Sequence, residues 1–376
     1  MANACGLNAT QQMADILIHV EDPGAANMVI GLPEKLVALG CDTILLASSY
    51  AKDFLASKGQ AFFARQGTPL GVLNIQKPKV VVVGTSEDKR AFSLPLTRTA
   101  QEIGIPTIGI VDMVCNANNR FRGGGDDPLG YVPDQLIVPD QATKDAYIQI
   151  GFPAKKISLL GHPAYDRAYQ YRQNNSVEPK QNSDRKKRIL FLAEGWDLFD
   201  EKLSYRSKDY TLEGRGGDNW RTAIVLEELL DALIALPELN AEVVVRPHPK
   251  MSASDFDRFA REITIEEGGD PLEAVSKADA VIGMTSMLLI EAAIVGRPVL
   301  SILPQPIEKD WLGPIKSGMI FCVITGTELK TALPKLLAGN VPSEFQKEWE
   351  SEFSEDSLAQ YICKFLESPQ KRFETI

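Results

Sequence analysis

Residues 241–303 decide the fold, because they hold two apolar strands that each end in polar residues. The first part reads AEVVVRPHPK (241–250) and is a predicted strand followed by a proline-rich exit. The second part reads ADAVIGMTSMLLIEAAIVGRPVLSIL (278–303) and predicts a strand, a turn at Thr285 and Ser286, a helix and another strand. α/β proteins build anion sites where an apolar strand runs into polar residues and a helix N-terminus. We therefore predict an anion site at these two strand ends.

The rest of the chain repeats this alternation of apolar strands and amphipathic helices. The run KVVVVG (79–84) is apolar on both faces, which is typical of a central parallel strand. With 376 residues, 44% of them hydrophobic, the chain can build two cores. We expect an α/β protein with two Rossmann-like domains that face each other across a cleft, in the glycosyltransferase-B arrangement.

The domain boundaries follow from where the alternation stops. We expect an N-terminal, acceptor-side domain at 1–174, a linker at 175–187 and a C-terminal, nucleotide-binding domain at 188–342. The linker is predicted from its Asn-, Ser- and charge-rich composition. Residues 343–376 predict helices that could cross back to the first domain.

Composition excludes several classes of protein. A net charge of -10 argues against nucleic-acid binding over the whole surface. The 5 cysteines are scattered and lack a CxxC pair, as in a reducing compartment, and indicate neither a disulfide framework nor a zinc site. Polar residues interrupt the longest apolar run, so we expect no transmembrane segment, although peripheral membrane contact stays open. The first residues lack a secretory signal pattern, and we expect a cytoplasmic protein.

The chain holds three histidines, His19, His162 and His248, and each follows or ends a predicted strand. His248 is the strongest candidate, because Pro247 and Pro249 fix an extended path out of the strand. Its imidazole could donate to a phosphate oxygen or move a proton near neutral pH. Arg246 beside it could donate a bidentate pair of hydrogen bonds to phosphate. The alternative is that the prolines only stiffen a loop.

The turn at Thr285 and Ser286 offers hydroxyl and N–H donors at a helix start, where an anion can bind. An ordinary serine N-cap is an equally good interpretation. Glu291 lies in the same apolar helix, and a buried carboxylate usually has a partner. That partner could be a ribose diol or Arg297.

Candidate acids and bases follow other strands. In the first domain Asp112 and His19 are the candidates, with helix capping as the alternative. In the second domain Glu194 ends the first strand and precedes a polar loop, 196–220, which we expect to be mobile and to cover substrate. The glycine run at 123–125 fits no dinucleotide fingerprint, so we exclude NAD.

The RPHP run (246–249) followed by the strand–Thr–Ser–helix–Glu–Gly-x-Pro-Val unit resembles the C-terminal domain of glycosyltransferase-B-fold enzymes. It is most similar to enzymes with CMP- or CDP-linked donors: bacterial sialyltransferases, capsule Kdo transferases and CDP-glycerol glycerophosphotransferases. The resemblance implies that His248, Thr285 and Ser286 contact donor phosphates and that Glu291 binds the ribose. The sialyltransferases carry an acidic-acidic-glycine motif for the general base, and Glu194 with its following glycine is one carboxylate short of it.

The same region is similar to the hydrolysing UDP-N-acetylglucosamine 2-epimerases. They share an Ala-Asp pair that opens the strand, here Ala278-Asp279, a serine at the turn and a following glutamate. Residues 161–166 (GHPAYD) resemble the Gly-x-Pro-x-x-Asp that ends the first domain in both groups. The epimerases' His-Thr-Gly-Gln-His signature near the N-terminus is replaced here by HVEDP (19–23).

We therefore expect an enzyme that transfers a sugar or alditol phosphate from a CMP-, CDP- or UDP-linked donor to a carbohydrate or lipid-linked acceptor, in surface polysaccharide synthesis. No obligatory metal or other cofactor is expected. The first alternative is a nucleotide-sugar 2-epimerase or hydrolase. The second is a noncatalytic protein that binds nucleotide sugars.

Overall fold

The computed structural model describes residues 13–175, 185–195, 205–217, 219–339 and 355–367. By its internal contacts the chain divides into unit 1, Met1–Pro163 with Phe353–Ile376, and unit 2, Ala164–Glu352. Most of the predicted linker, and the predicted C-terminal helices outside 355–367, lie outside the described residues.

Unit 1 is built on a seven-stranded sheet in the order β3-β2-β1-β4-β5-β6-β7, and neighbouring strands in it run parallel. The strands are β1 (Ile16–Val20), β2 (Thr43–Ala47), β3 (Phe63–Ala64), β4 (Val80–Gly84), β5 (Thr107–Ile110), β6 (Gln135–Val138) and β7 (Ile157–Leu159). The predicted central strand is β4, and all five of its residues are buried. In the register of the sheet, Ile18 of β1 lies between Leu45 and Val82.

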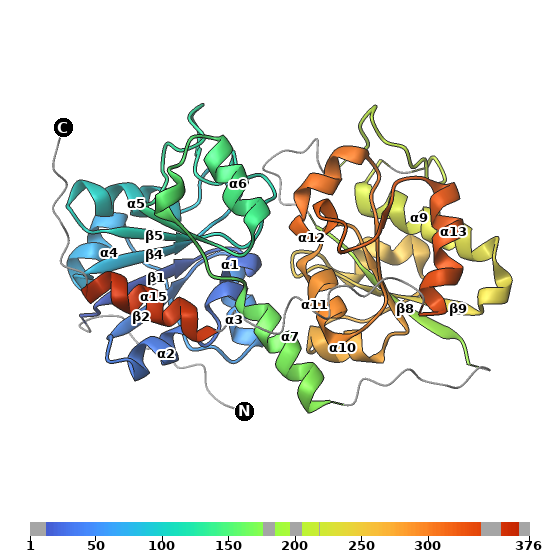
Figure 1. The fold of residues 1–376 in the computed structure, drawn as a ribbon, viewed down its shortest axis with the longest axis horizontal. Coiled ribbons are helices and arrows are strands. Elements are labelled where there is room, and N and C mark those ends of the chain that lie inside the picture. Colours follow the sequence, from blue (N-terminus) through green and yellow to red (C-terminus); the bar gives the residue numbers. More distant parts are fainter. Residues whose placement is uncertain (1–12, 176–184, 196–204, 218, 340–354, 368–376) are drawn as a thin grey trace. The chain divides into compact units, whose positions relative to one another are not determined.

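Helices cover both faces of this sheet (Figure 1). On one face Ile18 and Val82 belong to a core with residues of α1 (Pro23–Val29), α2 (Leu32–Ala38), α3 (Tyr50–Ser57) and α15 (Glu355–Glu367). On the other face Leu17 and Val81 pack with α4 (Pro69–Gln76) and α5 (Ser93–Glu102). Successive strand residues point to opposite faces, so an all-apolar strand is needed to fill both cores. The helix α6 (Gln141–Gln149) and the short η1 (Ala154–Lys156) connect β6 to β7.

Unit 2 holds a six-stranded sheet in the order β10-β9-β8-β11-β12-β13, in which neighbouring strands again run parallel. Its strands are β8 (Lys187–Leu192), β9 (Ala241–Arg246), β10 (Ile263–Ile265), β11 (Ala280–Gly283), β12 (Val299–Ile302) and β13 (Cys322–Val323). Its helices are α7 (Pro163–Asn174), α9 (Arg221–Ile234), η2 (Pro237–Leu239), η3 (Ala253–Phe259), α10 (Pro271–Lys277), α11 (Met287–Val295), η4 (Pro306–Trp311), α12 (Gly313–Lys316) and α13 (Gly326–Leu337).

The predicted fold class, two parallel α/β domains, is confirmed. In each sheet the first strand along the chain, β1 or β8, has the second strand on one side and the fourth on the other. The chain therefore adds strands first on one side of β1 or β8 and then on the other, so each of these strands marks a topological switch point. α/β proteins place ligands at the carboxyl ends of the strands at such a point. The facing of the two domains across a cleft stays a prediction.

Several element boundaries differ from those predicted. The sequence pattern of 25–39 predicts one helix, or two with a break at Pro33. The structure has two helices, because Gly31 adopts a left-handed φ of 76° between α1 and α2. The pattern of 254–262 predicts a helix, and the structure has the 3-10 segment η3 there. No helix among the described residues is long and apolar enough to cross a membrane.

Candidate functional site

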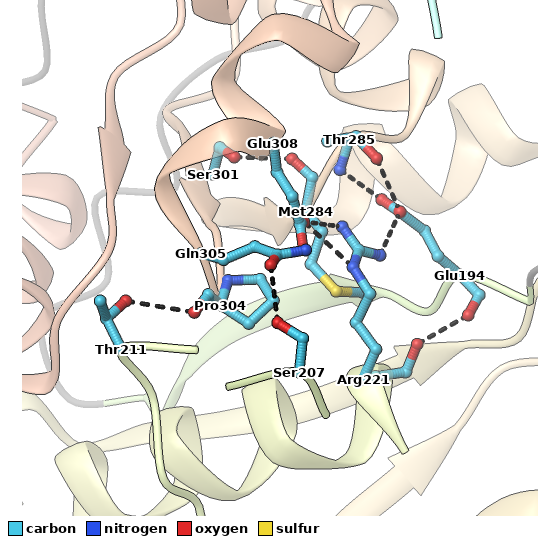
Figure 2. A network of polar contacts seen from close by, with 11 residues as sticks. Glu194, Ser207, Thr211, Arg221, Met284, Thr285, Ser301, Pro304, Gln305 and Glu308 are labelled. Carbon is cyan, nitrogen blue, oxygen red and sulfur yellow. Dashed lines mark hydrogen bonds and ion pairs between the residues drawn. The ribbon is translucent and has the colours of Figure 1, made fainter. Parts of the chain in front are cut away.

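At the switch point of unit 2, the residues that follow β8 and β11 are joined by a buried carboxylate. Glu194 accepts hydrogen bonds from both donors of Thr285, the backbone N–H and the hydroxyl, the latter at 2.9 Å (Figure 2). The backbone carbonyl of Glu194 also accepts a bond of 2.6 Å from the hydroxyl of Thr222. The turn before α11 is therefore fixed to the end of β8.

A fully buried arginine completes this arrangement. Arg221, with 0% of its surface exposed, donates from Nη1 to Glu194 at 2.9 Å and pairs with Glu308 of η4 (Figure 2). Burial raises the pKa of the Glu308 carboxyl, against the lowering effect of Arg221. Arg221 is the first residue of α9, where a positive charge opposes the helix dipole, so the two carboxylates must hold it there.

These contacts concern the predicted phosphate contact of the Thr285–Ser286 turn and the predicted role of Glu194 as a base. Both donors of Thr285 are already bonded to Glu194, so Thr285 shapes the turn, and its direct contact with phosphate stays a prediction. Ser286 is the N-cap of α11 and accepts from the N–H of Leu288 at 3.3 Å. Glu194 accepts three side-chain and backbone donors, which favours a positioning role over the predicted role of base.

His248, after β9, lies beside the end of β8. Its Nδ1 accepts the backbone N–H of Lys250 at 3.2 Å, so the neutral ring carries its proton on Nε2. A Cβ added to Gly195 would lie 2.7 Å from a side-chain carbon of Met251 and 3.7 Å from Nδ1 of His248. The fold thus brings the ends of β8 and β9 together, and the predicted joint anion site of the ends of β9 and β11 stays a prediction.

Arg246, the last residue of β9, is half-buried. Its Nη2 donates to the carbonyl of Gly269 at 2.9 Å, and burial lowers the pKa of the guanidinium. Nη1 is buried and, within the part of the chain that the structure describes, has no hydrogen-bond partner. One donor of Arg246 therefore remains for a ligand.

Glu291, the predicted ribose contact, is buried in α11. The alternative partner, Arg297, donates instead to the carbonyl of Ser276 at 2.7 Å. The ribose contact stays a prediction.

In unit 1 the carboxylate of Asp112, just past β5, is held by a buried arginine that the sequence analysis did not select. Arg120 donates from Nη1 to Asp112 at 2.7 Å and to the hydroxyl of Thr85 at 2.8 Å. Its Nη2 lies 3.8 Å from a carboxylate oxygen of Glu87. Burial raises the pKa of Glu87, while the charge of Arg120 acts in the opposite direction. Two carboxyl groups thus share one cation at the ends of β4 and β5.

The first residues of α1 pack against the carboxylate of Asp112. A Cβ added to Gly24 would lie only 2.1 Å from Oδ2 of Asp112. Glycine is therefore required where the helix approaches the carboxylate, since any larger residue would displace it.

His19, another predicted catalytic residue, is 0% exposed at the end of β1. Its Nε2 lies 3.2 Å from the hydroxyl of Ser48, which donates to Glu21 at 3.1 Å. Glu21 in turn accepts the backbone N–H groups of Phe92 and Ser93, each at 3.0 Å, at the start of α5. Burial lowers the pKa of His19 to about 4, so the ring is neutral at pH 7. This favours a structural role, and direct catalysis by His19 stays a prediction.

The predicted covering loop lies partly outside the described residues, which omit 196–204 and 218. Arg215, within its described part, pairs with Asp231 and Glu262, each at 2.7 Å. Over the residues that the structure describes, no group of three or more His, Cys, Asp or Glu is placed to hold a metal ion.

No protein-family model matches the sequence, and neither does any curated protein. The fold, by contrast, is shared with solved structures along nearly the whole chain. The UDP-GlcNAc 2-epimerase of Methanocaldococcus jannaschii, in complex with UDP-GlcNAc and UDP, has 16% identity and a TM-score of 0.62, covering 93% of this chain and 99% of its own. That of Neisseria meningitidis, bound to UDP-GlcNAc, has 13% identity and a TM-score of 0.63, covering 93% and 99%. HepE of Anabaena, in complex with UDP and glucose, has 12% identity and a TM-score of 0.58, covering 94% and 100%.

These comparisons correct the main functional expectation. The glycosyltransferase-B-like fold and its likeness to the 2-epimerases are as the sequence resemblance implied. The expectation of an enzyme that transfers a sugar or alditol phosphate from a CMP-, CDP- or UDP-linked donor was wrong, because several of the similar structures are UDP-GlcNAc 2-epimerases. The alternative, an epimerase, has the better support.

Proposed function

We propose that this protein is an enzyme of the hydrolysing 2-epimerase type that acts on a UDP-linked sugar. The observation that carries the proposal is the fixed turn at the switch point of unit 2, where Glu194 holds Thr285 and Arg221 neutralises Glu194. Without Arg221, a carboxylate at this place would repel a diphosphate. The bound UDP and UDP-sugars of the similar structures support the choice of nucleotide.

The diphosphate would meet three kinds of donor in unit 2. The first turn of α11 offers backbone N–H groups at the positive end of a helix. The Nε2–H of His248 and Nη1 of Arg246 lie at the end of β9. We infer that these groups bind the diphosphate and stabilise the charge that develops as it leaves the sugar.

Inverting C2 of such a sugar requires a proton to leave one face of the carbon and a proton to return to the other. The C2–H bond has no neighbouring carbonyl to acidify it, so its electrons must form a C1–C2 double bond as the diphosphate leaves C1. Addition of water across this bond, with OH at C1 and H at C2, then gives the free sugar of inverted configuration. The reaction therefore needs an anion site and at least one acid–base pair.

The carboxyl groups of unit 1 supply that pair in our proposal. Asp112, paired with Arg120, would act as the base, and Glu87, whose pKa is raised by burial, would carry the proton that the reaction returns. The observation behind this assignment is the different surroundings of two carboxyl groups around one guanidinium.

The test is incubation of the full chain with UDP-GlcNAc, with UDP followed by chromatography and the free sugar by NMR. We expect UDP and the 2-epimer in equal amounts, and loss of both products in Asp112→Asn. Release of UDP with unchanged configuration at C2 would identify a hydrolase. Binding without turnover would identify a noncatalytic nucleotide-sugar-binding protein, and either result would refute the epimerase.

A further inference from the structure

Two cysteines far apart in the sequence meet in unit 1. Cys41 lies between α2 and β2, and Cys363 lies on α15. Their sulfur atoms are 2.9 Å apart, although 322 positions separate them along the chain. Both are thiols in the structure.

The surroundings keep this pair in place. Cys41 is 7% exposed and Cys363 is 8% exposed, and both belong to the core on the α2 face of the sheet. Leu36 of α2 and Ile362 of α15 are fully buried in the same core. Nearer the start of α15, Asp356 pairs with Lys35 of α2 at 2.9 Å. In Figure 1, α15 lies beside the β1–β2 side of the sheet.

A disulfide needs the two sulfur atoms at about 2.05 Å, so closing this pair requires a movement of about 1 Å. Cys41 lies in the connection between α2 and β2 and Cys363 lies on α15, and small χ1 rotations of the two side chains can make a shift of this size.

We propose that Cys41 and Cys363 are a modification site, at which oxidation forms a disulfide that links α15 covalently to the connection between α2 and β2. The oxidant is a peroxide. The thiolate of one cysteine attacks a peroxide oxygen, and gives a sulfenic acid and hydroxide. The thiol of the other cysteine then attacks the sulfenic sulfur, and the S–S bond forms as water leaves. In total, two thiols and one H₂O₂ give one disulfide and two waters.

The reaction is slow while α15 is packed against the core. Burial raises the pKa of Cys363 to about 12, and contact with Cys41 acts in the same direction. Only a thiolate attacks the peroxide, so oxidation speeds up with rising pH or when α15 detaches transiently. The proposal is independent of the proposed function.

The test treats the full chain with hydrogen peroxide, unfolds it in an alkylating reagent and maps the peptides by mass spectrometry. We expect a peptide pair joined through Cys41 and Cys363, and a midpoint of thermal unfolding of unit 1 about 5–10 °C higher, reversed by dithiothreitol. Cys363→Ala should abolish the linked pair, and the matched control Cys322→Ala should leave it unchanged.

Alkylation of both residues after peroxide treatment that oxidises other thiols would overturn the proposal. A bond from Cys41 to any other cysteine, or a bond only between two molecules, would overturn it as well. If Cys363→Ala does not fold, the peptide map of the wild-type chain still decides between these results.

Discussion

At the scale of single residues, a buried arginine holds the turn that we assign to the diphosphate. Replacing Arg221 by Leu leaves Glu194 and Glu308 buried without their cation, which costs roughly 3–5 kcal/mol in comparable cases. We expect the urea midpoint of unit 2 to fall accordingly. Arg215→Leu, which breaks a partly exposed ion-pair network, should cost about 1 kcal/mol or less and serves as the control. Equal losses in the two variants would show that the buried network does not hold the turn.

The contribution of His248 to nucleotide binding is tested by His248→Ala. We expect the affinity for UDP to fall by at least ~1 kcal/mol, because a charge-assisted hydrogen bond to the diphosphate is lost. Isothermal titration calorimetry measures the change. Lys277→Ala removes an exposed cation of the same unit, paired with Glu273 at 2.6 Å, and should leave the affinity unchanged. Wild-type affinity in His248→Ala would remove this residue from the site.

The neutral His19 makes the stability of unit 1 sensitive to acid. Its pKa is lowered by burial to about 4 in the folded state, from the ordinary 6.5. Between these values the unfolded chain binds a proton that the folded chain does not. The stabilisation is therefore present above pH 6.5 and lost as the pH falls to 4, by about 3 kcal/mol. In His19→Leu, the loss of unfolding free energy between pH 7 and pH 4 should be smaller by this amount, and an unchanged pH profile would contradict the prediction.

Some candidate site residues could be proposed from the sequence and others could not, for a physical reason. Arg246 and His248 could be proposed because polar residues directly follow an apolar strand, which is a local signal. Arg221 and Glu308 were missed because they lie 87 positions apart. Arg120 lies only 8 positions from Asp112, but it was missed because it stands in a polar stretch without a strand or helix pattern. One signal was present: a cation at the start of an apolar helix opposes the helix dipole and so implies a carboxylate partner.

At the scale of elements, the close packing of α1 against the end of β5 depends on one glycine. Gly24→Ala would place a methyl group 2.1 Å from Oδ2 of Asp112, so the helix or the carboxylate must shift. We expect a loss of about 1–3 kcal/mol in stability, measured by urea unfolding, together with loss of the proposed epimerase activity.

The control for this change is Gly124→Ala, because a Cβ at Gly124 meets nothing within 4 Å. It should keep both stability and activity. Full activity in Gly24→Ala would show that the position of Asp112 is not needed for the reaction.

The positions of the elements with a clear apolar pattern were predictable. The strand β4 is apolar throughout, and the pattern of α11 is interrupted only by Glu291. The sequence also predicts strands at 263–265 and 319–323, where β10 and β13 lie, whereas the two-residue strand β3 has too few residues to show a pattern. The break between α1 and α2 lies at Gly31, whose left-handed backbone ends the helix ahead of Pro33, the break that the sequence predicts.

At the scale of the whole molecule, two parallel α/β domains could be predicted because both halves alternate strands and helices. The reaction that the enzyme catalyses could not be predicted from the sequence. The resemblance that favoured a transferase lies mainly in residues 240–303, which we assign to nucleotide binding, and a nucleotide site is common to enzymes that transfer the sugar and enzymes that epimerise it. What distinguishes them is the acid–base chemistry, and here its candidates, Asp112 and Glu87, belong to the other unit.

The most direct test of the proposed function is therefore the fate of the hydrogen at C2. The wild-type chain is incubated with UDP-GlcNAc in D₂O, and the free sugar is examined by NMR and mass spectrometry. We predict one deuterium at C2 of the 2-epimer, because the original proton leaves and a solvent-derived one returns. In Glu87→Gln we predict loss of turnover with UDP affinity retained. Free sugar of unchanged configuration with hydrogen still at C2 would contradict the account, because cleavage would then proceed without any chemistry at that carbon.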